Sequence, residues 1–174
     1  MTDDQARRIT QDFLDRQGEA TMAGDVEATL DFCDIPCTLE SLQGRAVVRS
    51  RAEMRAICNA FLSEMAGRRL THMVRRCLDA VHKDDGSIWA TYETRYVHER
   101  QLLTEEPYLS LVILKRCQGR WKASGMQFAV ARDSPANTTL RGWQARRIRV
   151  PTEPAMRPPP GVASHREVFE KLAQ

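Results

Sequence analysis

The sequence lacks several features that would assign a protein to a class at once. No apolar run approaches the ~20 residues that a membrane span needs, and the first residues show no charged-then-apolar signal pattern. The formal net charge is only +3 over 174 residues, which argues against a dedicated nucleic-acid-binding surface. We therefore expect a cytoplasmic protein that has neither a membrane nor a nucleic acid as its partner.

Metal-binding spacings are also missing. The five cysteines form no CxxC pair, and the four histidines form no HxH or HExxH motif; zinc sites use spacings of this kind. An odd number of cysteines, most of them on apolar faces, is typical of small buried residues in a reducing compartment. The sequence therefore predicts no metal ion and no cofactor.

The first part of the chain consists of apolar stripes separated by capping residues and breakers, and a hydrophobic content of 42% is enough for a packed core. Gly24 closes the first stripe, Asp25 caps a short second one, and Pro36 ends it. Thr2 and Gln5 can form a capping box at the start of the first stripe, and a Ser-x-x-Glu capping box at Ser50 opens the third. The predicted elements are a helix over 4–23, a short helix after Asp25, strands over 37–42 and 45–48, and a helix over 51–65.

From residue 68 onward the period of the apolar pattern changes to two, which predicts strands. The segment from Leu109 to Leu114 is apolar at almost every position, whereas a strand with one exposed face would alternate. We infer that both of its faces are covered, one by the helices and one by another subunit. The predicted hairpins pair strand 70–83 with 88–100, around Asp85-Gly86, and strand 108–117 with 121–130.

After residue 132 the composition shifts towards proline and arginine. We expect residues 133–174 to form an extended tail with little core of its own. A capping box at Ser164 opens a short terminal helix that needs a surface to dock on. The sequence thus divides into a domain over 1–132 and a tail over 133–174.

The order of these elements resembles that of the nuclear transport factor 2-like superfamily, in particular its SnoaL-like and ketosteroid-isomerase-like branch. The resemblance implies an α+β fold, in which a cone-shaped, strongly curved antiparallel sheet wraps round three N-terminal helices. It also implies a pocket at the wide end and a homodimer through the convex face of the sheet. It covers about residues 5–130 and rests on Ala23-Gly24-Asp25, the strand Thr38-Leu39-Glu40-Ser41 ending near Gly44, the helix from Arg51 to Met65, and the two hairpins.

Ketosteroid-isomerase-like enzymes use an Asp base, with a Tyr and a neutral Asp that stabilise the oxyanion. The resemblance places these three positions at Ser41, Gln17 and Val112, so none of them carries its acid–base group and the reaction should not be carried over. Glu40 is adjacent to the base position, but strand alternation points it to the other face unless a bulge turns it inward.

Hairpin pairing offers another pair of candidates. If the first hairpin has a two-residue loop, Asp79 lies opposite Tyr92, and Arg75 lies opposite Tyr96. A Tyr and an Asp on one concave wall could act as acid and base, or orient a polar ligand. The alternative is an ordinary cross-strand pair, and a register slip of one residue would move the whole set to the opposite face.

These patterns predict a pocket for a small, largely apolar molecule. The protein would be either an isomerase, cyclase or dehydratase of the SnoaL-like type, or a non-catalytic assembly or ligand-carrier module such as a small subunit of a ring-hydroxylating dioxygenase. The sequence leaves open whether it is an enzyme. Asp79 and Tyr92 are the candidate catalytic pair, and the candidate ligand-binding residues are Gln17, Ser41, Ile57, Phe61, Tyr96, Ser110 and Val112.

Overall fold

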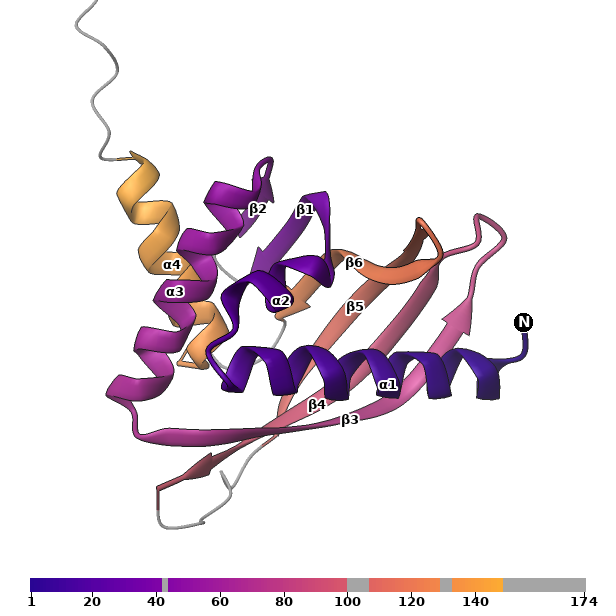
Figure 1. The fold of residues 1–174 in the computed structure, drawn as a ribbon, viewed down its shortest axis with the longest axis horizontal. Helices are drawn as coiled ribbons and strands as arrows, with labels where there is room; N and C mark the ends of the chain where they lie inside the picture. Colours follow the sequence, from indigo (N-terminus) through magenta and orange to yellow (C-terminus); the bar gives the residue numbers. More distant parts are fainter. Residues whose placement is uncertain (42–43, 100–106, 129–132, 149–174) are drawn as a thin grey trace, which may run out of the picture.

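A computed structural model describes residues 1–41, 44–99, 107–128 and 133–148. In this part of the chain, six strands form one curved, open sheet with helices packed on its concave side (Figure 1). The elements are α1 (Asp3–Met22), α2 (Val26–Asp31), β1 (Cys33–Ser41), β2 (Gly44–Val48), α3 (Arg51–Gly67), β3 (Leu70–His82), β4 (Ile88–His98), β5 (Tyr108–Cys117), β6 (Arg120–Phe128) and α4 (Pro135–Ile148).

The three N-terminal helices begin at the capping residues that the sequence indicates. Thr2 and Gln5 form a reciprocal capping box at α1, and the carboxylate of Asp25 accepts from the backbone of Ala28 at α2. Ser50 accepts from the backbone of Glu53 at α3. The predicted α+β class, with a curved sheet round three N-terminal helices, is therefore confirmed.

The strands follow the order β2-β1-β6-β5-β4-β3, and every neighbouring pair is antiparallel except β1 and β6, which are parallel. Strand β1 begins at Cys33 and runs through Pro36, so the expectation that Pro36 lies before the strand is wrong. The register with β6 shifts between Cys33 and Thr38. Proline lacks a backbone donor and is tolerated in a strand at such an irregularity.

Helix α1 lies along the concave side of the sheet, while α3 and α4 lie side by side at one end of the molecule (Figure 1). Phe13 and Leu14 of α1 pack against Tyr92, Val112 and Leu114 of the sheet. A second core joins α2 and α3 to β1 and β2. A smaller third core joins Met65 of α3 to Leu70 of β3 and Tyr96 of β4. The site described below lies where the three cores meet.

The C-terminal region differs from the sequence-based expectation. Residues 135–148 form α4, whose Leu140 and Trp143 are buried against Met54 and Ile57 of α3, so the prediction of an extended tail is wrong for this segment. The predicted terminal helix from Ser164 lies outside the described residues. The division of the chain at residue 132 stays a prediction.

The first hairpin also differs in register. Its loop closes through a bond from the backbone N–H of Lys83 to the carbonyl of Ser87, with Gly86 at φ 80°, and is longer than the predicted two-residue loop. A further register shift lies between Cys77 and Asp79. Cys77 therefore pairs with Tyr92, and Asp79 pairs with Thr91.

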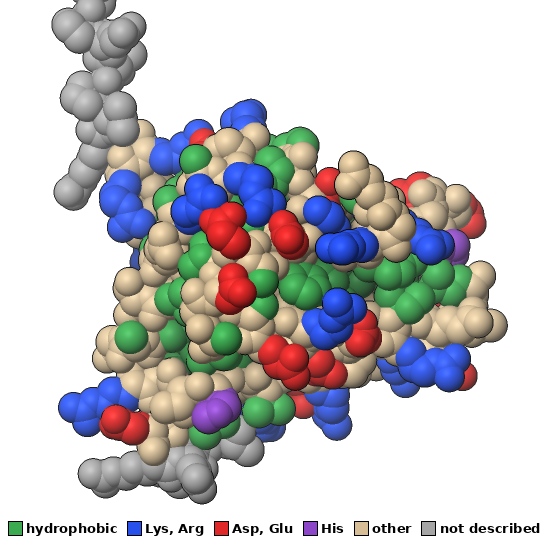
Figure 2. Space-filling view, in the orientation of Figure 1, with side chains coloured by type: hydrophobic (Ala, Val, Ile, Leu, Met, Phe, Trp, Pro, Cys, Tyr) green, Lys and Arg blue, Asp and Glu red, His purple; other side chains and the backbone are tan. Residues whose placement is uncertain are grey.

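On its outer surface the molecule carries interspersed charges. Figure 2 shows acidic and basic side chains next to one another over α2 and α3, where Arg51 and Arg55 pair with Glu27 at 3.2 and 2.6 Å. Exposed pairs of this kind contribute little stability. Among the described helices, none is long and apolar enough to cross a membrane.

Candidate functional site

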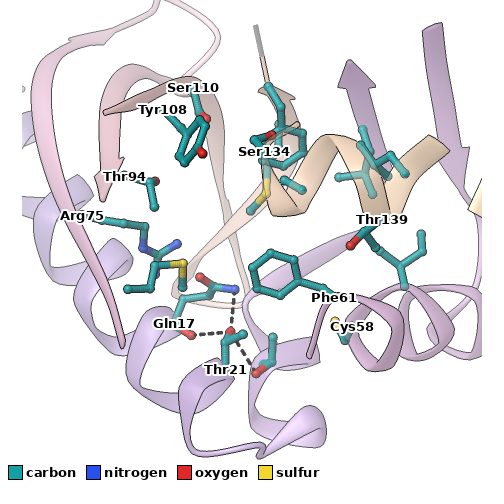
Figure 3. Close-up of a pocket in the computed structure, with 18 of the residues that line it drawn as sticks. Gln17, Thr21, Cys58, Phe61, Arg75, Thr94, Tyr108, Ser110, Ser134 and Thr139 are labelled. Carbon is teal, nitrogen blue, oxygen red and sulfur yellow. Dashed lines mark hydrogen bonds between the residues drawn. The ribbon is translucent and has the colours of Figure 1, made fainter. Parts of the chain in front are cut away.

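A cavity of about 130 Å³ lies between the helices and the concave face of the sheet. Side chains from α1, α2, α3 and α4 and from strands β1, β3, β4, β5 and β6 reach it, so all three cores contribute to its wall. An engineered apolar cavity of roughly 150 Å³ binds benzene, so this volume suits a ligand of about one ring. Figure 3 shows Arg75, Thr94 and Gln17 on one side of the cavity, and Phe61 and Cys58, together with Thr139 of α4, on the other.

The apolar side is formed by aliphatic, aromatic and thiol side chains. Burial raises the pKa of the Cys37 thiol to about 12 and that of Cys58 to about 11, and it also raises the pKa of Cys33. These thiols are therefore neutral near pH 7 and act as small apolar groups rather than nucleophiles. This side consists of Cys33, Cys37, Leu39, Met54, Ile57, Cys58, Phe61, Met126, Phe128 and Leu140.

Arg75 is the cation of the polar side. It is partly buried on β3, and its Nη2 donates to the backbone carbonyl of Leu14 in α1. Space for the guanidinium comes from Gly18, one turn further along α1, because a Cβ at that position would lie 2.7 Å from Nη2. Burial lowers the pKa of Arg75, but a guanidinium starts so high that it remains protonated at neutral pH.

Tyrosines surround this cation. The Tyr92 hydroxyl forms a hydrogen bond with Ser110; burial raises the pKa of Tyr92, while the nearby Arg75 charge and the Ser110 bond partly oppose the rise. Burial and the neighbouring Tyr92 raise the pKa of Tyr96, whose ring lies 5.6 Å from that of Tyr108. These phenols are neutral near pH 7, so they donate hydrogen bonds and do not act as bases.

Gln17 completes the polar side with an oriented amide. The Thr21 hydroxyl donates to the backbone carbonyl of Gln17 at 2.7 Å, so it can only accept from the Gln17 side chain, whose Nε2 lies 3.1 Å away. This arrangement leaves Gln17 Oε1 as a buried acceptor without a partner among the described residues. Figure 3 shows Gln17, Arg75 and Thr94 on the same side of the cavity.

The structure places six of the predicted site residues in the cavity wall and three outside it. Asp79 is exposed on the edge strand and forms an ion pair with Arg7 at 3.6 Å, so the expected Asp79–Tyr92 pair is not assembled. Ser41 lies at the end of β1, where its hydroxyl donates to the Gly44 carbonyl at 3.4 Å. Val112 is fully buried in the first core. The six in the wall are Gln17, Ile57, Phe61, Tyr92, Tyr96 and Ser110.

Glu40 faces away from the cavity, as alternation predicts. It pairs with Gln127 of β6, whose Nε2 donates to its carboxylate at 3.0 Å. The bulge in β1 lies earlier, between Cys33 and Thr38, and does not turn Glu40 inward.

Sequence reasoning missed the role of Arg75 and of the hydroxyl groups near it. An arginine in a predicted strand looks like an exposed residue, and only the glycine inside the first helix hinted at a close approach. Thr94 is the cross-strand partner of Arg75 in strands β3 and β4. The predicted two-residue hairpin loop instead places Arg75 opposite Tyr96, so it gives the wrong partner for both residues. The other missed wall residues with side-chain hydroxyls are Thr21, Thr29, Ser134 and Thr139.

The titratable groups of this site are one arginine, three tyrosines and three cysteines. None of the described residues that line the cavity is an Asp, a Glu or a His. Nor do the described residues contain a group of three His, Cys, Asp or Glu side chains that could hold a metal ion. The site can bind an apolar group on one side and donate hydrogen bonds on the other.

Comparison with known proteins finds similarity in structure only. No protein-family model and no curated protein matches this sequence. Three solved structures illustrate the similarity. A nuclear transport factor 2-like protein of unknown function from Shewanella oneidensis has a TM-score of 0.55 at 11% identity, over 71% of this chain and 98% of that one.

A ketosteroid isomerase-like protein from Erwinia carotovora atroseptica has a TM-score of 0.53 at 12% identity, over 71% of this chain and 94% of that one. A proposed aromatic ring hydroxylase from Novosphingobium aromaticivorans has a TM-score of 0.51 at 15% identity, over 73% and 90%. Identities this low establish the fold alone. The resemblance indicated by the sequence is thereby confirmed: this chain has the nuclear transport factor 2-like fold.

Proposed function

We propose that this protein binds a small, largely apolar molecule in the cavity on the concave side of its sheet. The observation that carries the proposal is the cavity itself, which has one wall of aliphatic, aromatic and neutral thiol groups and a few convergent polar groups. Small-molecule sites in proteins have this composition. The volume of about 130 Å³ fits one ring.

Binding, rather than proton abstraction, is the function that the lining favours. An isomerase, cyclase or dehydratase of the SnoaL-like type needs a base within hydrogen-bond reach of its substrate. The described lining offers phenols and thiols with raised pKa values, which hold their protons at pH 7. A ligand carrier or a ligand-responsive module needs no such base.

A cavity-filling variant tests this proposal. Cys58 lines the cavity from α3, and Asn59 is exposed on the same helix. We expect toluene to bind the wild-type chain and Asn59→Phe, as measured by chemical-shift changes in an amide NMR spectrum. Cys58→Phe should lose this binding, because the added ring occupies the space. Toluene binding that is equal in both variants, or absent from the wild type, would contradict the proposal.

A second proposal concerns assembly, and it rests on the convex surface, defined here as Val81, Trp89, Leu109, Leu111 and Ile113, of which Leu109 also borders the cavity. Trp89 and Leu109 are each 42% exposed, and Trp89 pairs with Val81 on one side and Ile113 on the other. An apolar surface of this kind on a sheet is typical of an interface. We propose that it packs against a second copy of the chain.

Light scattering after size-exclusion chromatography tests the assembly. Wild-type protein should elute as a dimer. Trp89→Glu should elute as a monomer, because burying a carboxylate in the interface removes its hydration, which is unfavourable. Asn59→Glu on the outer side of α3 is the matched control and should remain dimeric. A monomeric wild type, or a Trp89→Glu dimer, would show that the convex surface is not a self-interface.

A further inference from the structure

Arg75 is a cation in a cavity whose described wall holds no carboxylate. Its guanidinium donates to the carbonyl of Leu14, and among the described residues no Asp or Glu forms an ion pair with it within 4.0 Å; the exposed Asp15 of α1 acts on its charge only from a greater distance. A partly buried charge without a counter-charge is costly, so such groups are usually paired. The charge balance of the cavity therefore favours a ligand that carries one negative charge.

The glycine that makes room for Arg75 lowers the intrinsic helix stability of α1. Glycine within a helix is less favourable than alanine, yet a Cβ at Gly18 would lie 2.7 Å from Arg75 Nη2. The glycine gives the guanidinium room to lie against the helix, where Leu14 fixes one of its nitrogen atoms. The guanidinium is thus held in one place, with donors left over.

Side chains with hydroxyl groups lie near the same position. Thr94 is the direct cross-strand partner of Arg75, and the neutral phenol groups of Tyr92 and Tyr96 lie close enough to Arg75 for its charge to act on them. A carboxylate accepts up to four hydrogen bonds and matches the planar fork of a guanidinium. The buried Gln17 Oε1 then takes a donor, such as a hydroxyl group of the ligand or a water molecule.

We propose that the ligand of this cavity is a small apolar carboxylate, whose carboxylate group binds Arg75 while its ring or alkyl body packs between α3 and β1. This inference rests on the proposed binding function and assigns the chemical class of the ligand. The differing chemistry of the two ends of the cavity sets the orientation of the ligand. Figure 3 shows Arg75 and Gln17 on one side and Phe61 and Cys58 on the other.

A matched pair of probes separates the charge from the ring. Phenylacetate carries a carboxylate, and phenylacetamide is its neutral analogue of nearly the same shape. By isothermal titration calorimetry of the full chain, phenylacetate should bind roughly ten- to a hundredfold more tightly than the amide, as expected for a charge-assisted hydrogen bond. Equal affinities, or a preference for the amide, would overturn the inference.

Two arginines on β3 provide the variant and its control. Arg75→Met should remove the preference for phenylacetate and change the affinity for the amide less than about twofold. Arg76→Met should keep the preference, because Arg76 is an exposed neighbour that pairs with Glu93 at 3.0 Å. If Arg75 had only a structural role, Arg75→Met would weaken the binding of phenylacetate and of phenylacetamide equally. That result would also overturn the inference.

A spectroscopic measurement on the wild type covers the case in which Arg75→Met fails to fold. The side-chain Nε–H resonance of Arg75, assigned by comparison with Arg75→Lys, should shift on addition of phenylacetate and stay in place with phenylacetamide. If the Arg75 resonance does not shift on addition of phenylacetate, that result would contradict the inference. If toluene and phenylacetamide bind while phenylacetate does not, only the inference fails; if none of the three binds, the proposed function fails with it.

Discussion

Strands β4 and β5 present two faces that differ in what covers them. On the concave face, Tyr92, Val112 and Leu114 are buried under α1 or beside the cavity. On the convex face, Trp89 and Leu109 are each 42% exposed. Both faces are rich in apolar side chains, so apolar character alone does not distinguish a core from a surface. What differs is whether another part of the same chain packs against them.

The largest expected effect separates the two faces by stability. Leu114→Ala removes a fully buried side chain from the first core and should lower the free energy of unfolding by about 2–5 kcal/mol. Leu109→Ala on the same strand should lower it by less than about 1 kcal/mol, because its side chain is 42% exposed. Urea unfolding followed by circular dichroism, at low protein concentration, provides both values.

Equal losses for the two leucines would contradict this comparison. They would mean that Leu109 is covered as fully as Leu114, for instance by a partner that remains bound at the lowest concentration measured. Repeating the Leu109→Ala measurement at several protein concentrations identifies that case, because the stability of a dimer depends on concentration.

A second effect concerns the thiols of the concave side. The Cys58 thiol has an ordinary pKa of 9.0, and burial raises its pKa to about 11 in the folded chain. Between pH 9 and 11 the unfolded chain therefore binds fewer protons than the folded chain, and stability falls as the pH rises. The free energy of unfolding keeps its full contribution from the protonated Cys58 thiol below pH 9. Between pH 9 and 11 it falls by about 1.4 kcal/mol per pH unit.

Cys58→Ala isolates this contribution from the other groups that titrate at high pH. The variant should lose less stability than the wild type between pH 9 and 11, measured by urea unfolding at each pH. Wild-type and variant curves that run parallel over this interval would show that the thiol is not protected from ionisation in the folded chain.

Much of the fold could be predicted because its signals are local. The capping box at Thr2, the N-cap at Ser50, the caps at Gly24 and Asp25, and the change of period after residue 68 all lie within a few residues of the elements that they define. The outward position of Glu40 follows from alternation alone.

The parts that could not be predicted depend on distant residues. The loop and the bulge of the first hairpin together change the partner of Tyr92 from Asp79 to Cys77, and neither irregularity has a clear local signal. Helix α4 is anchored mainly by Leu140 and Trp143, which is too weak a pattern to distinguish from a polar tail.

Arg75 shows the same limit at the candidate site. Its environment is set by Gly18, which lies 57 positions earlier in the chain on another element. A strand pattern reports which side of a sheet a residue faces, but it does not report where a helix leaves a gap. The polar side of the cavity is therefore a property of the assembled fold.

The smallest expected effect on stability tests that gap directly. Gly18→Ala replaces a glycine within α1 and gains up to about 1 kcal/mol of helix propensity, while its new Cβ would lie 2.7 Å from Arg75 Nη2 and must displace the guanidinium from Leu14. The two effects oppose one another, so the free energy of unfolding should change by less than about 1 kcal/mol. Phenylacetate affinity should nevertheless fall severalfold, while phenylacetamide affinity stays the same, as measured by calorimetry.

Gly67→Ala, at a glycine of α3 where an added Cβ would meet no atom within 4 Å, should leave both affinities unchanged. If Gly18→Ala retains the wild-type preference for phenylacetate, the placement of the guanidinium against α1 does not govern what the concave side binds.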